Sequence, residues 1–210
     1  MQKSTILYLI SILFLVTSCA TNNLEKELKV VTLETTVYNA PYFANTEIDY
    51  VYKANISVYG NDLSGIFIAK KINATTHRVV FTTEFGNKLL DFEISETDFK
   101  VNSIVDELNR KILINTLKSD FRLLLKSQFL IKGQLEDLEN KVYKSEDGAQ
   151  FNYLFASKTD NKLFKISHAT KRKEQINIHF TSENNTFAEN IIIQHYNIKL
   201  RFELNYLKTN

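Results

Sequence analysis

The chain has 210 residues, with one cysteine, one proline and five glycines, and its formal net charge is +2. This near-neutral balance, without any long run of like charge, excludes a basic nucleic-acid-binding protein, and a single cysteine excludes a disulfide scaffold. The length fits one domain, and ten tyrosines with fifteen phenylalanines require a large apolar interior.

The N-terminus has the pattern of a secretory signal peptide. Lys3 supplies a positive charge, and Ile6–Val16 is almost wholly apolar but too short to span a bilayer. Residues 15–19 read Leu-Val-Thr-Ser-Cys, which resembles the bacterial lipobox. The resemblance implies that residues 1–18 are removed and that Cys19 becomes an N-terminus acylated with palmitate or a similar chain. A secreted protein with a stray cysteine and an uncleaved anchor are the alternatives.

Residues 19–46 are predicted to form a lipidated tether outside the folded core. Leu24, Leu28 and Val31 have helical spacing, but Val31–Val37 also alternates like a strand, so the type of element stays open. Asn39-Ala40-Pro41 ends whichever element forms. The folded domain is therefore predicted to span residues 47–210.

The first part of this domain has the two-residue period of antiparallel strands. Apolar residues alternate with largely polar ones from Ile48 to Val58, which predicts a half-buried strand. Four further strands are predicted, over residues 63–72, 78–85, 88–95 and 98–101. A turn at Gly86-Asn87 joins the strands 78–85 and 88–95 into a hairpin.

The period then becomes helical, which predicts a helical insert over about residues 103–146. Ser103 and Asp106 resemble a helix start, and the apolar spacing predicts a long or broken helix over Ile104–Lys126. A second, short helix is predicted over Gln134–Val142 from the spacing of Leu135, Leu138 and Val142.

Strand patterns return after the insert, at residues 151–155, 164–168, 176–180 and 196–206. The last would be roughly 35 Å long at about 3.3 Å per residue, and strands of that length twist and coil. A set of such strands wraps into a barrel or half-barrel more readily than it lies flat, so we predict an α+β fold with a curved antiparallel sheet of about nine or ten strands. The helical insert supplies the amphipathic helices that would cover the apolar face of this sheet.

This order of elements resembles the LolA/LolB lipoprotein-localisation fold. The resemblance covers Glu47 to Leu207. It is carried by Leu63–Ile68, by the hairpin His77–Ile94 with its Phe85-Gly86-Asn87 turn, and by the lid-like run Leu117–Leu125. It implies that the sheet is an unclosed antiparallel β-barrel and that the helical insert acts as its lid. It also implies an apolar cavity between sheet and lid that takes acyl chains, in an outer-membrane lipoprotein of a Gram-negative bacterium.

Nine apolar residues on the inward-facing positions are candidate ligand-binding residues. They are Tyr52, Ile56, Phe81, Phe92, Leu117, Phe121, Leu124, Phe151 and Phe202. The alternative is that they form an ordinary packed core. A continuous void of several hundred Å³ would favour binding, and a filled core would favour the alternative.

The predicted function is that of an outer-membrane-anchored lipoprotein, facing the periplasm, which binds a lipid or an acyl chain of a lipoprotein. The alternative is a structural or accessory envelope lipoprotein with a packed core that binds another envelope protein, whose identity stays open. The membrane is the expected partner through the lipid on Cys19, and nucleic acid is not.

No enzyme, cofactor or metal site is predicted. The chain has no Gly-x-Ser-x-Gly, His-Glu-x-x-His or glycine-rich phosphate motif. Its four histidines are scattered, and the phase of His168 and His195 favours a buried core histidine. The basic clusters Lys70-Lys71 and Lys171-Arg172-Lys173 are interpreted as solvated turns rather than as contacts to lipid headgroups.

Overall fold

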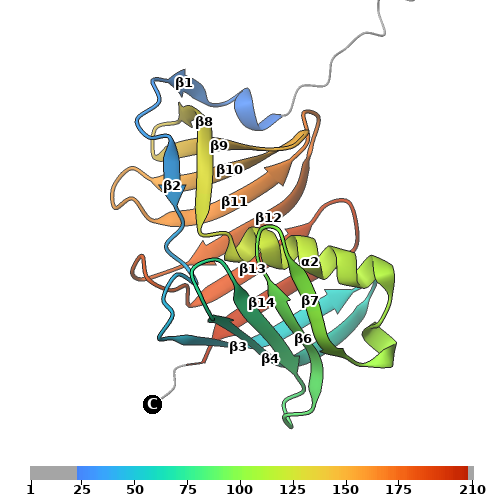
Figure 1. Cartoon of the computed structure of the whole chain (residues 1–210). Coiled ribbons are helices and arrows are strands. Elements are labelled where there is room, and N and C mark those ends of the chain that lie inside the picture. The colour runs from blue at the N-terminus through green and yellow to red at the C-terminus, as the bar shows by residue number, and fades with distance from the viewer. Residues whose placement is uncertain (1–22, 208–210) are drawn as a thin grey trace, which may run out of the picture.

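The computed structural model describes residues 23–207 (Figure 1). The signal peptide expected over residues 1–18 and the lipid site expected at Cys19 lie outside this range. The described helices are α2 (Lys111–Leu125) and two short 3-10 helices, η1 (Asn23–Glu25) and η2 (Asp106–Leu108). The strands are β1 (Lys29–Val31), β2 (Val37–Asn39), β3 (Asp49–Val58), β4 (Asn61–Lys71), β5 (His77–Thr82), β6 (Lys88–Ile94), β7 (Phe99–Ile104), β8 (Gln128–Glu136), β9 (Asn140–Asp147), β10 (Gln150–Ser157), β11 (Leu163–Ala169), β12 (Glu174–Thr181), β13 (Asn190–His195) and β14 (Leu200–Tyr206).

These strands form one antiparallel sheet in the order β1-β8-β9-β10-β11-β12-β13-β14-β3-β4-β5-β6-β7, with β2 also beside β8. Within residues 23–207, β1 and β7 do not pair with each other, so the sheet curves without closing. Helix α2 follows β7 and leads into β8, and it lies across the sheet between these far ends (Figure 1). The predicted curved, unclosed antiparallel sheet with a helical lid is confirmed.

The sheet has fourteen strands rather than nine or ten. One of the additional strands is β13, which the apolar run before His195 forms by pairing with β12 and β14. The long last strand expected over residues 196–206 is also shorter than predicted. Its first four residues form the turn between β13 and β14, where the Tyr196 N–H donates to the Gln175 carbonyl.

Helix α2 begins at Lys111, seven residues later than expected. Residues 99–104 pair with β6 as the edge strand β7, and η2 then turns the chain. The predicted apolar stripe consists of Leu117, Phe121, Leu124 and Leu125. All four residues are buried beneath the helix, as the stripe requires.

The second predicted helix, Gln134–Val142, is wrong. These residues form the β8–β9 hairpin, in which Leu135 faces Val142 across the ladder. The Asp137 carboxylate accepts the backbone N–H of Glu139 at 2.8 Å and of Asn140 at 2.7 Å, which closes the turn. Three apolar residues at helical spacing also fit a hairpin, and pairing of β9 with β10 decides the outcome. The predicted insert of residues 103–146 therefore contains a single α-helix.

The expectation that the tether lies outside the core is wrong for its described part, residues 23–46. β1 and β2 pair with β8, and the chain then enters the core at Tyr42 and Phe43. The Tyr42 hydroxyl donates to the Leu163 carbonyl at 2.6 Å, and His77 Nε2 lies 2.8 Å from the Phe43 carbonyl oxygen. We call residues 23–43 the N-terminal strap, because they cover one end of the sheet.

The core lies on both faces of the sheet. The main cluster fills the concave side beneath α2 and includes the inward residues of β3–β6 and β10–β14. A second cluster lies on the opposite face, where Leu24 and Leu28 of the strap pack against Tyr153 and Phe155 of β10. Alternate residues of one strand thus belong to different clusters.

Candidate functional site

A small apolar cavity lies between α2 and the sheet. Its volume is about 90 Å³, and every residue that lines it is apolar. The lining comes from five strands, from α2 and from the turn before it: Ala54, Ile56, Val58, Leu63, Phe67, Phe81, Leu90, Leu108, Leu113, Leu117, Phe121, Leu200, Phe202 and Leu204.

The cavity extends from the interior to the rim of the sheet. At the inner end, the Phe121 ring lies 5.4 Å from the Phe67 ring and 6.4 Å from the Phe202 ring, measured between centroids. At the rim, Leu63 is 45% exposed. A ligand that entered here would meet only hydrocarbon, so the site has no group for acid–base or nucleophilic chemistry.

Gly65 of β4 shapes one wall of the cavity. A methyl group at this position would come within 2.8 Å of the Phe81 ring and would also meet the Thr82 carbonyl. The missing side chain therefore allows the Phe81 ring to lie close against β4.

Five of the nine predicted ligand-binding residues line this cavity: Ile56, Phe81, Leu117, Phe121 and Phe202. Tyr52, Phe92 and Leu124 are buried in the same core but away from the cavity. The Tyr52 hydroxyl donates to the Ala188 carbonyl at 3.0 Å, and the Phe92 ring packs on Phe99 with centroids 5.0 Å apart.

The inclusion of Phe151 in the predicted set is corrected. It lies with the second cluster on the opposite face of the sheet, and the Lys144 ammonium lies 4.4 Å from the centre of its ring. Its neighbours Gln150 and Asn152 are the residues of β10 that line the cleft beside α2. Apolar alternation identified the strand but could not tell which face was concave, because both faces are covered.

Sequence reasoning missed the residues at the rim. Leu108 and Leu113 lie just before and at the start of α2, and Val58 and Leu63 flank the β3–β4 turn. They are close together only because the turn meets the start of the helix. Their one sequence signal was that they are apolar residues next to a turn.

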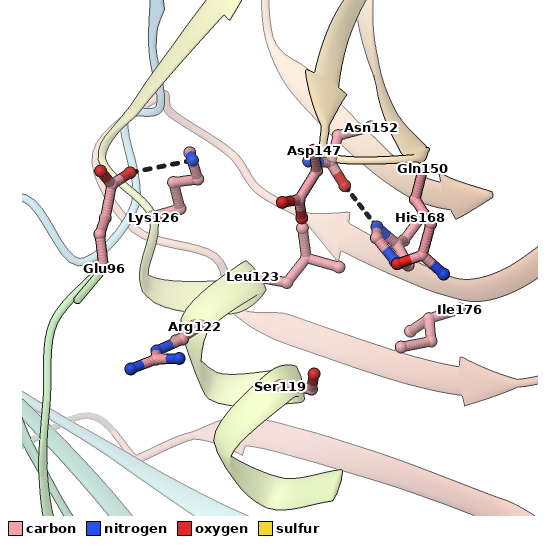
Figure 2. Close-up of a pocket in the computed structure, with 10 residues that line it drawn as sticks. All are labelled: Glu96, Ser119, Arg122, Leu123, Lys126, Asp147, Gln150, Asn152, His168 and Ile176. Atoms are coloured by element: carbon pink, nitrogen blue, oxygen red, sulfur yellow. Dashed lines mark hydrogen bonds and ion pairs between the residues drawn. The ribbon is translucent and has the colours of Figure 1, made fainter. Parts of the chain in front are cut away.

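A polar cleft of about 340 Å³ lies on the other flank of α2. Figure 2 shows Ser119 and Leu123 pointing toward Asp147 and His168, whereas Arg122 points away. The ring nitrogens of His168 lie 2.7 Å from Asn152 Oδ1 and 3.0 Å from Gln150 Oε1, and burial lowers the pKa of His168.

At its outer side the cleft is bordered by an ion pair. Lys126 Nζ lies 2.9 Å from the Glu96 carboxylate, and Arg122 donates to the carbonyls of Ser95 and Thr97. These contacts attach the C-terminal turn of α2 to the β6–β7 turn. The cleft thus contains mainly groups that already bind one another.

A buried contact between Asp120 and His195 fixes the middle of α2. Asp120 Oδ2 lies 2.9 Å from His195 Nε2 of β13, and both side chains are almost completely buried. Burial raises the pKa of Asp120. Among the described residues, Asp120 Oδ1 and His195 Nδ1 have no hydrogen-bond partner. His195 is thus the buried core histidine that the sequence favoured.

Within residues 23–207, no cluster of three or more histidine, cysteine or acidic residues could hold a metal ion. No described helix is long and apolar enough to cross a membrane.

No protein-family model and no curated protein sequence matches the chain. Its fold is similar to that of a LolA superfamily protein from Nitrosomonas europaea, with a TM-score of 0.51 and 9% identity over 80% of this chain and 88% of that one. A domain from Vibrio parahaemolyticus described as outer membrane lipoprotein-sorting has a TM-score of 0.46 and 9% identity over 76% and 83% of the two chains. A DUF1329 family protein from Desulfovibrio piger has a TM-score of 0.42 and 10% identity over 76% and 84%. The likeness to the Nitrosomonas europaea protein shows that the chain has a LolA-like fold.

Proposed function

We propose that this protein is a lipoprotein, anchored through Cys19 in the outer membrane and facing the periplasm, that binds a lipid or acyl chain beneath α2. The observation that supports it is the wholly apolar cavity between a helix and the concave side of an unclosed sheet. The LolA-like fold agrees with this, although its likeness concerns the fold alone. The anchor rests on the sequence pattern that ends at Cys19.

The size of the cavity requires that α2 moves when a ligand binds. At about 90 Å³ it is smaller than the roughly 300–1,000 Å³ of ordinary ligand pockets. Tight burial elsewhere in the core means that additional space can come only from displacing an element. We propose that α2, which lies closed on the sheet in the structure, separates from it to admit a chain.

The N-terminal half of α2 is the half that would move. None of its residues before Leu117 is buried, Ile112 is 84% exposed, and no side chain caps its first turn. The C-terminal half is held by the Asp120–His195 pair and by the contacts of Arg122. Leu113 of this N-terminal half and Leu108, just before it, border the cavity at its rim.

Mass spectrometry of lipids bound to the purified protein tests the proposal. The protein should be released from its membrane in mild detergent and transferred to detergent-free buffer, and its bound lipids should then be extracted. Retention of a stoichiometric acyl lipid, displaced by an added fluorescent fatty acid, is the expected result. A protein that binds neither would contradict cavity binding.

The small size of the cavity also favours the second candidate, an accessory envelope lipoprotein that binds another protein. In that case α2 stays in place and the core residues only support the outer surface. Capture of an envelope protein, together with failure to bind any acyl probe, would support this function instead.

A further inference from the structure

The turn between β11 and β12 carries a cluster of free cations. Lys171, Arg172 and Lys173 are all exposed, and none of them forms a salt bridge within the described part of the chain. Lysines on nearby strands do form salt bridges, because Lys165 lies 3.6 Å from Glu174 and Lys144 lies 2.6 Å from Glu25. The turn therefore has positive charge available for an external partner.

The N-terminal strap begins beside this turn. Arg172 and Lys173 line a shallow surface hollow together with Leu24 of the strap and Tyr196, and Lys165, Glu27 and Glu174 complete the lining. Glu174 is already occupied by Lys165 and by the Ser167 hydroxyl, which donates to it at 3.0 Å. The hollow is thus net positive.

The strap is fixed at this position. The Glu25 carboxylate accepts from Lys144 Nζ and from the Tyr153 hydroxyl, each at 2.6 Å. Leu24 and Leu28 pack on the second cluster. Only three residues lie between Cys19 and Asn23, and the four Cα–Cα steps that join them span at most about 14 Å when fully extended. A lipid on Cys19 would hold the basic turn close to the bilayer surface.

We propose that the basic turn of Lys171, Arg172 and Lys173 docks on the anionic phospholipid headgroups of the leaflet that holds the Cys19 lipid. The proposal rests on the anchor at Cys19. Each Lys or Arg beside an anionic surface increases the equilibrium constant for contact roughly fivefold, and the attraction extends over about 8–10 Å. Tyr196, 57% exposed in the same hollow, suits the headgroup region, where aromatic side chains with a polar end are favoured.

Docking at this end of the sheet would also orient the cavity. The β3–β4 turn lies beside the β13–β14 turn, because the Tyr59 N–H donates to the Lys199 carbonyl at 2.9 Å. β12 and β3 are three strands apart in the sheet, or about 14 Å at the usual spacing. The cavity rim at Leu63 therefore faces the same side as the basic turn, so a chain could pass between leaflet and cavity.

Depth-dependent quenching tests this orientation with the full lipidated protein. A single cysteine is introduced at Asn197, beside the basic turn, or at Asn185, beyond the other end of β13, and carries a fluorophore. The protein is reconstituted in phosphatidylcholine vesicles with or without phosphatidylglycerol, with a spin-labelled headgroup lipid as quencher. In anionic vesicles we expect quenching at Asn197 to exceed that at Asn185 severalfold.

Two matched variants identify the charges responsible. Arg172→Gln/Lys173→Gln should reduce the difference between the two positions to the smaller one that the Cys19 tether alone imposes, as should phosphatidylcholine alone, whereas Lys70→Gln/Lys71→Gln should preserve the full difference. Equal quenching at both positions in anionic vesicles, or a difference that is undiminished in Arg172→Gln/Lys173→Gln, would overturn the docking surface. Wild-type protein, whose only cysteine is Cys19, reports the anchor separately: if it takes up the fluorophore, the proposed lipid anchor itself fails.

Discussion

Phe121 belongs both to the α2 stripe and to the cavity wall. Its ring contacts Phe67 and Phe202, but one side faces the void. A buried Phe→Ala change in a tightly packed core costs about 3–5 kcal/mol. We expect Phe121→Ala to cost less than this range in chemical denaturation, because part of its surface is unpacked, and to weaken binding of a fluorescent fatty acid.

Phe92→Ala is the matched control, because Phe92 is fully buried away from the cavity. It should lose the full 3–5 kcal/mol or so and keep its affinity for the fatty acid. A loss of that size for Phe121→Ala, with no binding by the wild type, would instead indicate an ordinary core.

Gly65 permits the close approach of Phe81 to β4. In Gly65→Ala the new methyl group meets the Thr82 backbone carbonyl of β5 as well as that ring, so both must shift, and overpacking of this kind costs roughly 1–3 kcal/mol or more. We expect a lower melting temperature and weaker fatty-acid binding. Gly133→Ala on β8 is the control, since a methyl group there meets Lys144 only at ordinary contact distance, 3.8 Å. Equal effects of the two variants would rule out the cavity wall as the cause.

His77 makes the stability of the strap depend on pH. Burial lowers the pKa of His77 from its ordinary value of 6.5, so the unfolded chain takes up the proton first as the pH falls. The stabilising contribution is complete above pH 6.5 and is lost as the pH falls through the lowered pKa. Asp120 acts in the opposite sense. Burial raises its pKa, so the contribution of Asp120 to the free energy of unfolding is lost as the pH rises through the raised pKa.

We therefore expect the free energy of unfolding to fall on acidification below about pH 6.5. In His77→Gln, where an amide can still donate to the Phe43 carbonyl, this dependence should be shallower. Denaturant titrations across that range make the measurement. Identical slopes in the two proteins would show that other groups, such as His168, dominate the dependence.

At the scale of elements, α2 has a firmly bound end and a loosely bound end. Arg110 occupies the N-cap with an extended backbone but makes no side-chain cap. Arg110→Asp supplies a carboxylate for the free N–H groups of the first turn, worth about 0.5–2 kcal/mol. We expect a higher melting temperature and slower entry of a fluorescent fatty acid in stopped-flow measurements.

Arg110→Gln is the control for loss of the positive charge without a strong cap, and it should change neither quantity much. Faster or unchanged entry in a stabilised Arg110→Asp protein would mean that the N-terminal half of α2 is not the element that opens.

At the scale of the whole molecule, Cys19→Ser separates anchoring from folding. The substitution removes the sulfur required for acylation, while the described contacts of the strap begin at residues 24 and 25. We expect loss of radiolabelled palmitate and of stable membrane attachment, with unchanged circular dichroism and melting temperature. Palmitate incorporation at the wild-type level would contradict this prediction.

The sequence by itself determined most of the antiparallel strands and the amphipathic stripe of α2. Each depends on a local period of two or of three to four residues, which any partner surface of the right polarity would satisfy. The curved, unclosed form of the sheet was anticipated from strand length together with the resemblance of the element order to a known fold. Tertiary structure decided the rest. Leu135 and Val142 joined a hairpin because neighbouring strands offered a ladder, and Tyr42 and Phe43 entered the core because the sheet left one end uncovered. The cavity also depends on nonlocal contacts, since its rim forms only where the β3–β4 turn meets the start of α2.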